Sequence, residues 1–471
     1  MKSKTCILCG VLAVLACLSG CEQPATSTTS PDFSIAITNV TVIDAVNGTR
    51  SDMTILLKGD EIVSVEPSAS VAPNAQQVID GAGGYLIPGL WDMHVHITYE
   101  PTLTTSMPDL FLDYGITSVR DTGGMLPKLL PEIEKWRTAG AQAPRVFFSG
   151  PLLDGAKVVY DGDDRPEIGI SNPTADAAVA NVEALVTAGV DFIKIYELVS
   201  PQVFATLVAQ ARQHKLPIAA HVPLALLADT AGPRVNSMEH LRNVELTCAS
   251  NADDLLVERS SILLDSGDLS GYALRSALHA EFRPRALADI DVTSERCKQV
   301  INSLRNTIQV PTLRLNTITQ YSPVSRADWQ SNLAKLPPAL ARQWRQTAES
   351  FLGQASADSL KMASWSLQLV GEMHRAAVPI GAGTDTPIGQ AIPGYSLHTE
   401  LERLVDAGLS PIEAIRSATI RPAEFFGIQA THGQIQTGHV ADLVLLSADP
   451  TLDIRNTRSI VSVISKGQVV R

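Results

Sequence analysis

The chain has few aromatic residues and contains no run of lysine and arginine. Aromatic residues make up 5% of its 471 residues, and 37 Lys and Arg stand against 49 Asp and Glu, which gives a formal net charge of −12. An acidic chain without a basic cluster lacks the surface that binds nucleic acid. With 45% hydrophobic residues, the chain can still bury a large core, enough for one large domain or for a barrel with an appended module.

The apolar stretch near the start of the chain is too short to span a bilayer comfortably. A basic start, MKSK, precedes ILCGVLAVLACL, and small residues follow before Cys21, which is the three-part build of a secretory signal. Residues 18–21, LSGC, resemble a bacterial lipobox, which implies cleavage before Cys21 and its lipidation. We therefore expect a signal peptide over 1–20, a flexible tether over 21–32 and an exported protein anchored by lipid to a bacterial membrane, facing the periplasm or the cell surface. An uncleaved N-terminal anchor helix is the alternative.

Cysteines are too few and too widely spaced to form a metal site. Loss of the signal and lipidation of Cys21 would leave only Cys248 and Cys297, either as free thiols or as a disulfide, which an exported location permits. A metal site would therefore depend on nitrogen and oxygen ligands.

Both ends of the chain have the pattern of short β-strands. Over 33–88 and again over 431–471, alternating Val and Ile segments are separated by Asn-Gly, Lys-Gly-Asp and similar turns. We expect the two parts to form one small β-sandwich domain. Between them, over 89–430, eight strand-like segments alternate with helical ones, which predicts an α/β fold, a (β/α)8 TIM barrel with its site at the carboxyl ends of the strands. The long segments 250–308 and 322–365 are expected to be insertions over the barrel mouth.

The stretch YLIPGLWDMHVH, residues 85–96, ends the first barrel strand with two histidines. Alternate residues of a strand point to the same face, so His94 and His96 should project together and could bind a metal through two imidazoles. Two half-buried histidines with ordinary hydrogen-bond partners are the alternative. A metal would need further ligands from elsewhere in the chain.

Polar residues at the ends of other buried strands are the candidates, because burying them is costly unless a partner satisfies them. They are Lys194 in DFIKIY, His221 in IAAHVP, His240 in SMEHL and Asp385 in GAGTDTP. Each has an ordinary explanation alone, such as an ion pair, a core histidine or a turn cap. Six such residues at the same end of strands 1, 4, 5, 6 and 8 favour a shared site.

These motifs, together with TSVRDTGG and LVGEMHRAAVPIGAGTDT, resemble the amidohydrolase superfamily in its form with two metals. The nearer likeness is to the imidazolonepropionase-related branch that includes Xaa-Pro and other prolidase-like dipeptidases. HVPL follows strand 5 where dipeptidases specific for basic residues often have a second histidine and a glycine, so an arginine or lysine dipeptidase is not expected.

The resemblance implies two divalent metal ions, with zinc as the expected metal. One would be held by His94, His96 and Asp385 and the other by His221 and His240. Lys194, carboxylated by carbon dioxide to a carbamate, would bridge them. The expected activity is hydrolysis of the amide bond of a dipeptide or N-acyl amino acid by a hydroxide that bridges the metals, with Asp385 moving the proton.

Several residues near these motifs have weaker assignments. Tyr196, two residues after Lys194, is a candidate donor to the substrate or a core aromatic. Arg120 and Asp121 are expected to pair with each other rather than to orient ligands. His398 is expected on a helix surface, and no role is assigned to the remaining histidines, which are His214, His279, His374, His432 and His439.

Three functions remain open. The first is the binuclear amidohydrolase acting on a small molecule or a dipeptide. The second is a one-metal hydrolase of cyclic amides, or a deaminase, in which Lys194 only forms an ion pair. The third is a surface binding protein that has kept the barrel without the chemistry. Assembly into a homo-oligomer is compatible with all three.

Overall fold

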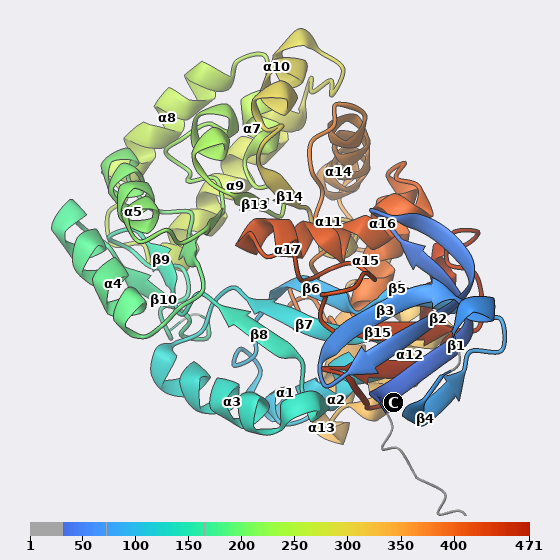
Figure 1. Cartoon of the computed structure of the whole chain (residues 1–471). Coiled ribbons are helices and arrows are strands. Elements are labelled where there is room, and N and C mark those ends of the chain that lie inside the picture. The colour runs from blue at the N-terminus through green and yellow to red at the C-terminus, as the bar shows by residue number, and fades with distance from the viewer. Residues whose placement is uncertain (1–31, 72, 164) are drawn as a thin grey trace, which may run out of the picture.

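A computed structural model describes residues 32–71, 73–163 and 165–471 (Figure 1). The predicted signal peptide, Cys21 and all but the last residue of the tether lie outside these ranges. Within them, none of the helices combines the length and the apolar character needed to cross a bilayer.

The middle of the chain forms a barrel of short parallel strands. One sheet has the order β6 (Leu90–Val95), β7 (Ile116–Asp121) and β8 (Arg145–Phe148), and the other has the order β10 (Gly169–Ser171), β9 (Leu152–Asp154), β11 (Ile193–Ile195), β12 (Ile218–Ala220), β13 (Ser237–Glu239) and β14 (Ile308–Val310). The predicted (β/α)8 barrel is confirmed, and the small β-sandwich domain predicted from both chain ends takes the form of one curled sheet, described below.

The barrel closes through an extended segment rather than through a regular eighth strand. The predicted strand VPIGAGTD, 378–385, makes one isolated bridge, from Ile380 to Gln309 on β14, and Thr386, the next residue, makes another with Val95 on β6. Its backbone is close to both neighbours, and a Cβ atom added to Gly383 would lie 2.8 Å from Cβ of His94. Glycine at 383 therefore permits an approach that a side chain would block, and it brings the end of this segment beside His94.

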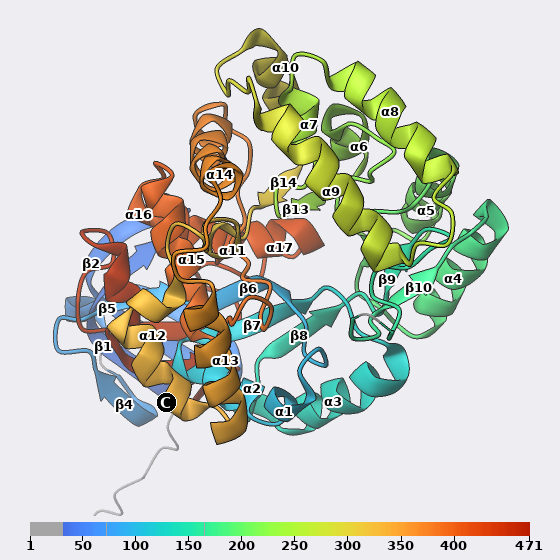
Figure 2. The ribbon, with the colours of Figure 1, turned by 180° about the vertical axis from the view of Figure 1, so that it is seen from behind.

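Amphipathic helices surround the barrel (Figure 2). In α5 (Pro201–Gln213), Ser200 caps the first turn by accepting a hydrogen bond from Val203 N, and the buried side chains recur at helical spacing. The other helices that follow barrel strands are α1 (Pro101–Thr104), α2 (Met107–Asp113), α3 (Leu126–Thr138), α4 (Ala175–Thr187), α6 (Ala228–Ala231), α7 (Val244–Cys248), α11 (Leu313–Asn316), α14 (Ala357–Arg375), α15 (Tyr395–Asp406), α16 (Pro411–Ser417) and α17 (Ile420–Phe426).

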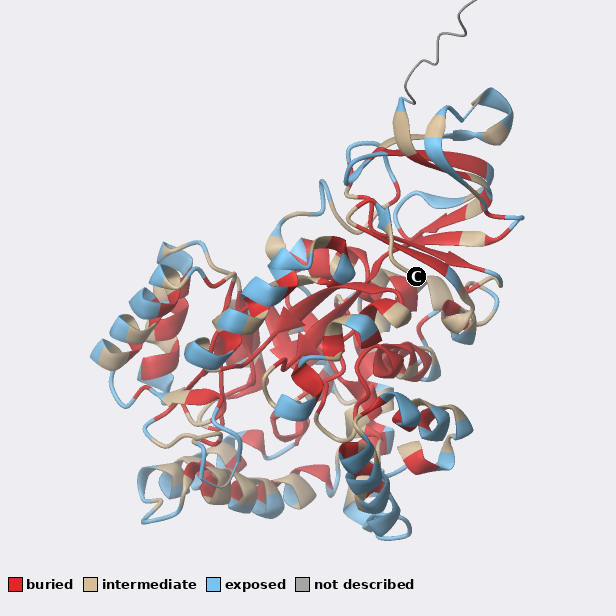
Figure 3. Cartoon of the chain, turned by 90° about the horizontal axis from the view of Figure 1, so that it is seen from below, coloured by how far each residue is buried: buried red, intermediate tan, exposed pale blue. Residues whose placement is uncertain are grey.

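Strands from both ends of the chain share one curled sheet beside the barrel, at the upper right of Figure 3. Its main path is β17 (Gln468–Val469), β16 (Ile460–Ser465), β15 (Leu443–Leu446), β5 (Tyr85–Pro88), β1 (Phe33–Asp44), β2 (Gly48–Lys58) and β3 (Glu61–Pro67), and β4 (Ala75–Asp80) pairs with β1. The contact between β5 and β15 is antiparallel and joins the two ends directly. Ile37, Ile55, Leu443 and Ile464 are buried together in its core, so neither end can fold around this core without the other.

The first long insertion forms a helical layer closed by a disulfide. It contains α8 (Ala252–Leu264), α9 (Gly271–Leu287) and α10 (Glu295–Ser303), and Cys248 is bonded to Cys297 across 49 residues of sequence. A cavity of about 520 Å³, lined by residues at the carboxyl ends of the barrel strands, is called the main cavity below. Residues of α9 line it, as expected for an insertion at the mouth.

The second long insertion was predicted over the mouth, and most of that prediction is wrong. Its helices α12 (Ala327–Asn332) and α13 (Pro338–Ser350) supply no residue to the main cavity; only the start of α14 does. Instead, Trp329 Nε1 donates to the carbonyl of Gln390 at 3.2 Å, and Lys335 pairs with Asp113 at 3.4 Å. The apolar face of this segment packs against the barrel's outer helices, which a hydropathy pattern alone does not distinguish from a lid.

His398 is buried rather than exposed on a helix surface, so that prediction is also wrong. It is 1% exposed on α15, its Nε2 donates to the Tyr114 carbonyl at 2.9 Å, and its Nδ1 lies 2.8 Å from Thr457 Oγ1. Burial, helped by the charge of Arg458, lowers the pKa of His398 to about 3. The folded protein therefore keeps this imidazole neutral over a pH range in which an unfolded chain protonates it.

We predict that His398 makes the fold sensitive to mild acid. Its folded pKa lies below its unfolded value, so stability is lost as the pH falls below about 6.5 and the unfolded chain takes up the proton. Between pH 6.5 and 5, the free energy of unfolding of the wild type should fall by roughly 2 kcal/mol more than that of His398→Gln. Urea unfolding at both pH values measures the difference, in which other histidines cancel. Equal losses in the two proteins would contradict the assignment.

Candidate metal centre

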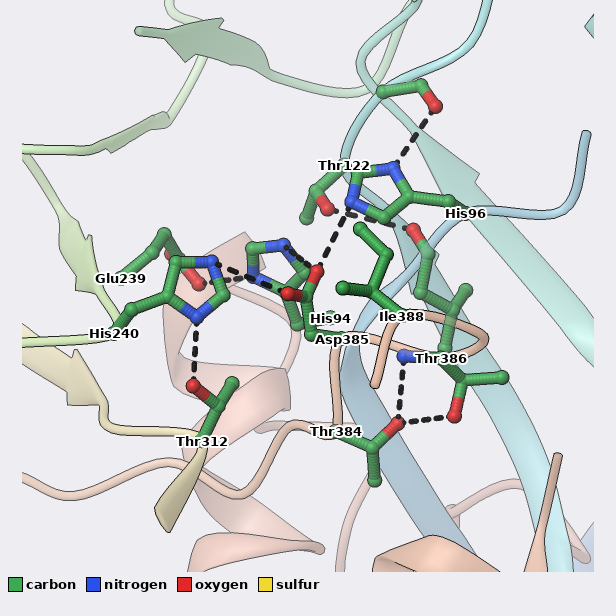
Figure 4. Close-up of polar contacts among 12 residues, drawn as sticks. His94, His96, Thr122, Glu239, His240, Thr312, Thr384, Asp385, Thr386 and Ile388 are labelled. Carbon is green, nitrogen blue, oxygen red and sulfur yellow. Dashed lines mark hydrogen bonds and ion pairs between the residues drawn. The ribbon is translucent and has the colours of Figure 1, made fainter. Parts of the chain in front are cut away.

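His94, His96 and Asp385 converge at the carboxyl end of the barrel. His94 lies on β6 and His96 follows it, so their rings leave the same face of one strand. His94 Nε2 lies 3.3 Å and His96 Nε2 lies 3.2 Å from Asp385 Oδ1, as Figure 4 shows. One ligand atom from each of the three lies within 4.8 Å of the others, and all three residues are buried. This group could hold a metal ion.

The other two predicted histidines lie directly beside this group. The ring of His240 is centred 4.5 Å from that of His94 and 4.8 Å from that of His221. His240 Nε2 lies 4.0 Å from Asp385 Oδ2, the second oxygen of the same carboxylate. The two sets of imidazoles therefore flank Asp385 on a cavity of about 520 Å³ that Lys194 also lines.

Each of the four imidazoles is held through Nδ1 by an oxygen atom of the protein. The pairs are His94 with Glu239 Oε2 at 2.7 Å, His96 with the Gly123 carbonyl at 3.0 Å, His221 with Glu197 Oε1 at 2.7 Å and His240 with Thr312 Oγ1 at 2.6 Å. A proton on Nδ1 serves these acceptors and leaves the lone pair of Nε2 available. Metal-binding histidines are usually held in this way.

Burial keeps two of the imidazoles neutral. The pKa of His221 is lowered to about 3 by burial and by the charge of Lys194, and burial holds that of His240 well below its usual range. Although burial opposes ionisation of Asp385, its contacts with the imidazoles of His240, His94 and His96 hold the pKa of this carboxyl well below its ordinary value. Neutral nitrogens beside an ionised carboxylate are a donor set suited to a divalent cation.

Lys194 is a buried amine without a partner. Its side chain is 1% exposed, and among the described residues Nζ has no hydrogen-bond acceptor. Burial lowers the pKa of Lys194 to about 8. Burying an unpaired ammonium is costly. Lys194 is therefore suited to a modification that replaces the positive charge of its amine.

Sequence reasoning missed Glu239, the buried carboxylate behind His94. Glu239 precedes His240 in the chain and also accepts hydrogen bonds from Arg120 Nη2 at 2.8 Å and Ser237 Oγ at 2.7 Å. The predicted pairing of Arg120 with Asp121 is therefore wrong: successive strand residues point to opposite faces, and Asp121 instead accepts from the Ile97 amide at 2.7 Å. The signal that could have revealed Glu239 is the motif MEH, in which it directly precedes the candidate ligand His240.

Sequence reasoning also missed Glu197 and its contact with the inserted helix. Glu197 accepts from His221 Nδ1, from His279 Nε2 at 2.7 Å and from Arg275 Nη2 at 3.2 Å. His279, which the sequence left without a role, thus lies at the site. It is four residues after Arg275 on α9, so the two share one helix face. Although burial opposes ionisation, the guanidinium of Arg275 holds the pKa of Glu197 well below its usual range.

Tyr196 lies in the cavity wall next to the histidines. Its ring is centred 4.4 Å from that of His221 and 5.8 Å from that of Tyr160, and burial raises its pKa well above the ordinary value. The phenol therefore stays protonated and can donate a hydrogen bond. This location is compatible with the substrate-facing role predicted for it.

Strained backbone at the strand ends positions two of the candidate ligands. Asp385 has φ +61° and His240 has φ +60°, a region that non-glycine residues seldom adopt. The segment around Asp385 is braced by Asp92, which accepts from Thr384 N at 3.0 Å and from Thr384 Oγ1 at 2.6 Å. Arg314 Nη1 also donates to the Thr384 carbonyl at 2.9 Å. Such bracing is what lets an unfavourable backbone conformation persist.

Comparison with known proteins agrees with this site. The Amidohydrolase family model matches residues 347–470. The chain is 34% identical over 122 residues to ochratoxinase of Aspergillus niger, covering 24% of each chain, and 37% identical over 83 residues to imidazolonepropionase of Salmonella typhi, covering 17% of this chain and 20% of that one. It is 37% identical over 87 residues to adenine deaminase 2 of Rhizobium etli, covering 18% and 14%. The chain thus spans less than a quarter of the length of these relatives.

Solved structures share the fold over nearly the whole chain. A Xaa-Pro dipeptidase with bound methionine aligns with a TM-score of 0.64 at 17% identity, covering 93% of this chain and 99% of that one. A putative prolidase from Bifidobacterium longum aligns with a TM-score of 0.64 at 23% identity, covering 93% and 94%. The predicted resemblance to the amidohydrolase superfamily, with its imidazolonepropionase and Xaa-Pro dipeptidase members, is confirmed.

We predict that Glu197 determines metal affinity at the His221 side of the site. Replacing it with Gln removes the negative charge that anchors His221, and metal affinity should fall about 10- to 100-fold. Competition with a chelator of known affinity, followed by metal analysis, measures the loss. Glu183→Gln is the matched control, because Glu183 accepts from His214 Nε2 at 2.9 Å on the surface. Equal metal retention in both variants would contradict this role.

Proposed function

We propose that this chain is a metal-dependent amidohydrolase that cleaves the amide bond of a small substrate, a dipeptide or an N-acyl amino acid. The observation that carries the proposal is the convergence of six side chains from five strand ends on one cavity: His94, His96, Lys194, His221, His240 and Asp385. The family match and the prolidase-like fold support a hydrolase acting on carbon–nitrogen bonds.

Two divalent ions fit the donor set. His94, His96 and Asp385 would hold one, and His221 with His240 would hold the other. Lys194, as a carbamate, would supply an oxygen to each. Nitrogen and oxygen donors without thiolate suit zinc. The one-metal alternative needs Lys194 to pair with a carboxylate, and among the described residues no ion pair involves it, which favours the two-metal assignment.

The bound ions and the residues of the site would have different roles in hydrolysis. Bound divalent ions would supply a polarised carbonyl and a water of lowered pKa. Asp385, whose ionised carboxylate lines the cavity, would accept a proton from the attacking water and deliver it to the leaving nitrogen. Tyr196 would donate a hydrogen bond to the substrate. Cleavage then yields a carboxylic acid and an amine, with the elements of one water added.

Export with a lipid anchor at Cys21 belongs to the same proposal. The disulfide between Cys248 and Cys297 supports it, because structural disulfides persist in oxidising compartments and are rare in the cytosol. Mass spectrometry of the mature N-terminus tests the anchor.

Metal-loaded protein prepared with bicarbonate should hydrolyse members of a panel of dipeptides and N-acyl amino acids, and chelation should abolish the activity. Lys194→Ala should lose one or both of two metal equivalents and lower kcat/KM at least about 100-fold, because the bridging group is gone. Lys298→Ala, which removes an exposed lysine paired with Glu295 at 2.8 Å, is the control. One metal equivalent in both proteins with unchanged activity would favour the one-metal alternative.

A further inference from the structure

Part of the wall of the main cavity is strongly cationic. Arg242, in the turn after β13, lines it together with Arg275 and Arg283 from α9, and Arg165 lies at the same cavity. None of these residues belongs to the predicted metal-ligand set. A wall with this charge selects what can enter, since it attracts anions and repels cations.

Two of these guanidinium groups already form ion pairs with carboxylates of the protein. Arg275 Nη2 lies 3.2 Å from Glu197 Oε1, and Arg283 Nε lies 3.1 Å from Glu245 Oε1. These pairs are internal and hold α9 against the barrel. They leave the charge of Arg242 without a carboxylate of its own.

Arg242 is a largely buried guanidinium that makes no hydrogen bond to the described residues. Its side chain is 17% exposed, and its nearest carboxylate atom, Glu197 Oε1, is 4.0 Å from Nε. That Nε is buried without a partner. A guanidinium has five N–H donors in a fixed fork, and leaving the buried Nε donor unused is costly unless an acceptor arrives from outside the protein.

The backbone around Arg242, which lines the cavity, is strained and is held by side-chain hydrogen bonds. His240, Leu241 and Asn243 have φ of +60°, +57° and +61°. Asn316 Nδ2 donates to the His240 carbonyl at 2.9 Å, and Asn243 Nδ2 donates to the Val222 carbonyl at 2.8 Å. The same turn therefore carries a predicted metal ligand and, two residues later, the guanidinium of Arg242, whose Nε has no hydrogen-bond partner among the described residues. The turn therefore sets the distance between the candidate metal site and the guanidinium of Arg242.

We infer that Arg242 binds the free carboxylate of the substrate and so makes the enzyme select acids over their neutral analogues. The inference rests on the proposed function and assigns the residue that recognises the acid group of its substrates. A carboxylate matches the guanidinium fork with two parallel hydrogen bonds. Tyr160 and Tyr196, which line the same cavity, have hydroxyl groups that add neutral donors. The surplus of arginines disfavours substrates with an ammonium side chain.

Substrates that differ only in the charge of their C-terminal group test the role of Arg242 directly. N-acetyl derivatives of L-proline, L-phenylalanine, L-aspartate and L-lysine are compared with the same compounds carrying a C-terminal carboxamide, by release of acetate. The wild type should favour the best acid over its carboxamide about 10- to 100-fold in kcat/KM, the range expected for a charge-assisted hydrogen bond. In Arg242→Met this preference should fall below about 3-fold, and Arg242→Lys should restore part of it.

Arg285→Met is the matched control, because Arg285 on α9 pairs instead with Glu258 at 2.8 Å and Glu281 at 3.3 Å and should keep the full preference. Equal rates on acid and carboxamide in the wild type, or an undiminished preference in Arg242→Met, would overturn the inference while the amidohydrolase proposal stands. If no compound is cleaved, the proposed function fails. Calorimetric binding of the acids and carboxamides to metal-loaded protein then tests Arg242 by itself. Tighter binding of the acids that is lost in Arg242→Met upholds the inference, and equal binding of acids and carboxamides overturns it.

Discussion

The hydrogen bonds that the Nδ1 atoms of four buried imidazoles donate to oxygen atoms of the protein are the constraint on which the site depends. A buried histidine can rotate and can take either tautomer, and only one orientation with one tautomer directs a free lone pair at the cavity. Glu197 and Glu239 impose this choice on His221 and His94. Because both carboxylates are themselves buried, each needs a cationic partner, and Arg275 and Arg120 provide the compensating charge. The arginines of the barrel interior and of the inserted helix are therefore part of how the imidazoles are oriented.

The barrel contributes its geometry to this network. Parallel strands end on one rim, so ligands separated by up to about 290 residues of sequence meet there without any local motif joining them. The closing segment is the least regular part, with isolated bridges in place of a ladder. It carries Asp385 in a left-handed conformation, and Asp92 and Arg314 hold its neighbours. Irregular backbone is tolerated there because buried side chains fix it from both sides.

Much of the fold and the set of candidate ligands could be predicted from the sequence, because strand periodicity and polar residues at buried strand ends are local signals. Lys194 in DFIKIY and His221 in IAAHVP are examples. The groups behind the ligands could not be predicted in this way. His279 is 82 residues from Glu197, on a helix whose pattern resembles that of any amphipathic surface helix. Arg120 and Asp121 are adjacent in sequence yet face opposite sides of β7, so proximity along the chain suggested a pair that the strand geometry forbids.

The disulfide between Cys248 and Cys297 closes the base of the segment that carries α8 and α9. Everything beyond that closure could be exchanged for another helical segment while the rim of the barrel, with its imidazoles, stayed as it is. Two requirements would limit the exchange: any replacement must again present a donor to Glu197, where His279 and Arg275 do so now, and a cation to Glu245, which pairs with Arg283. Within those two requirements, the cavity wall could change while the imidazoles at the barrel rim kept their positions.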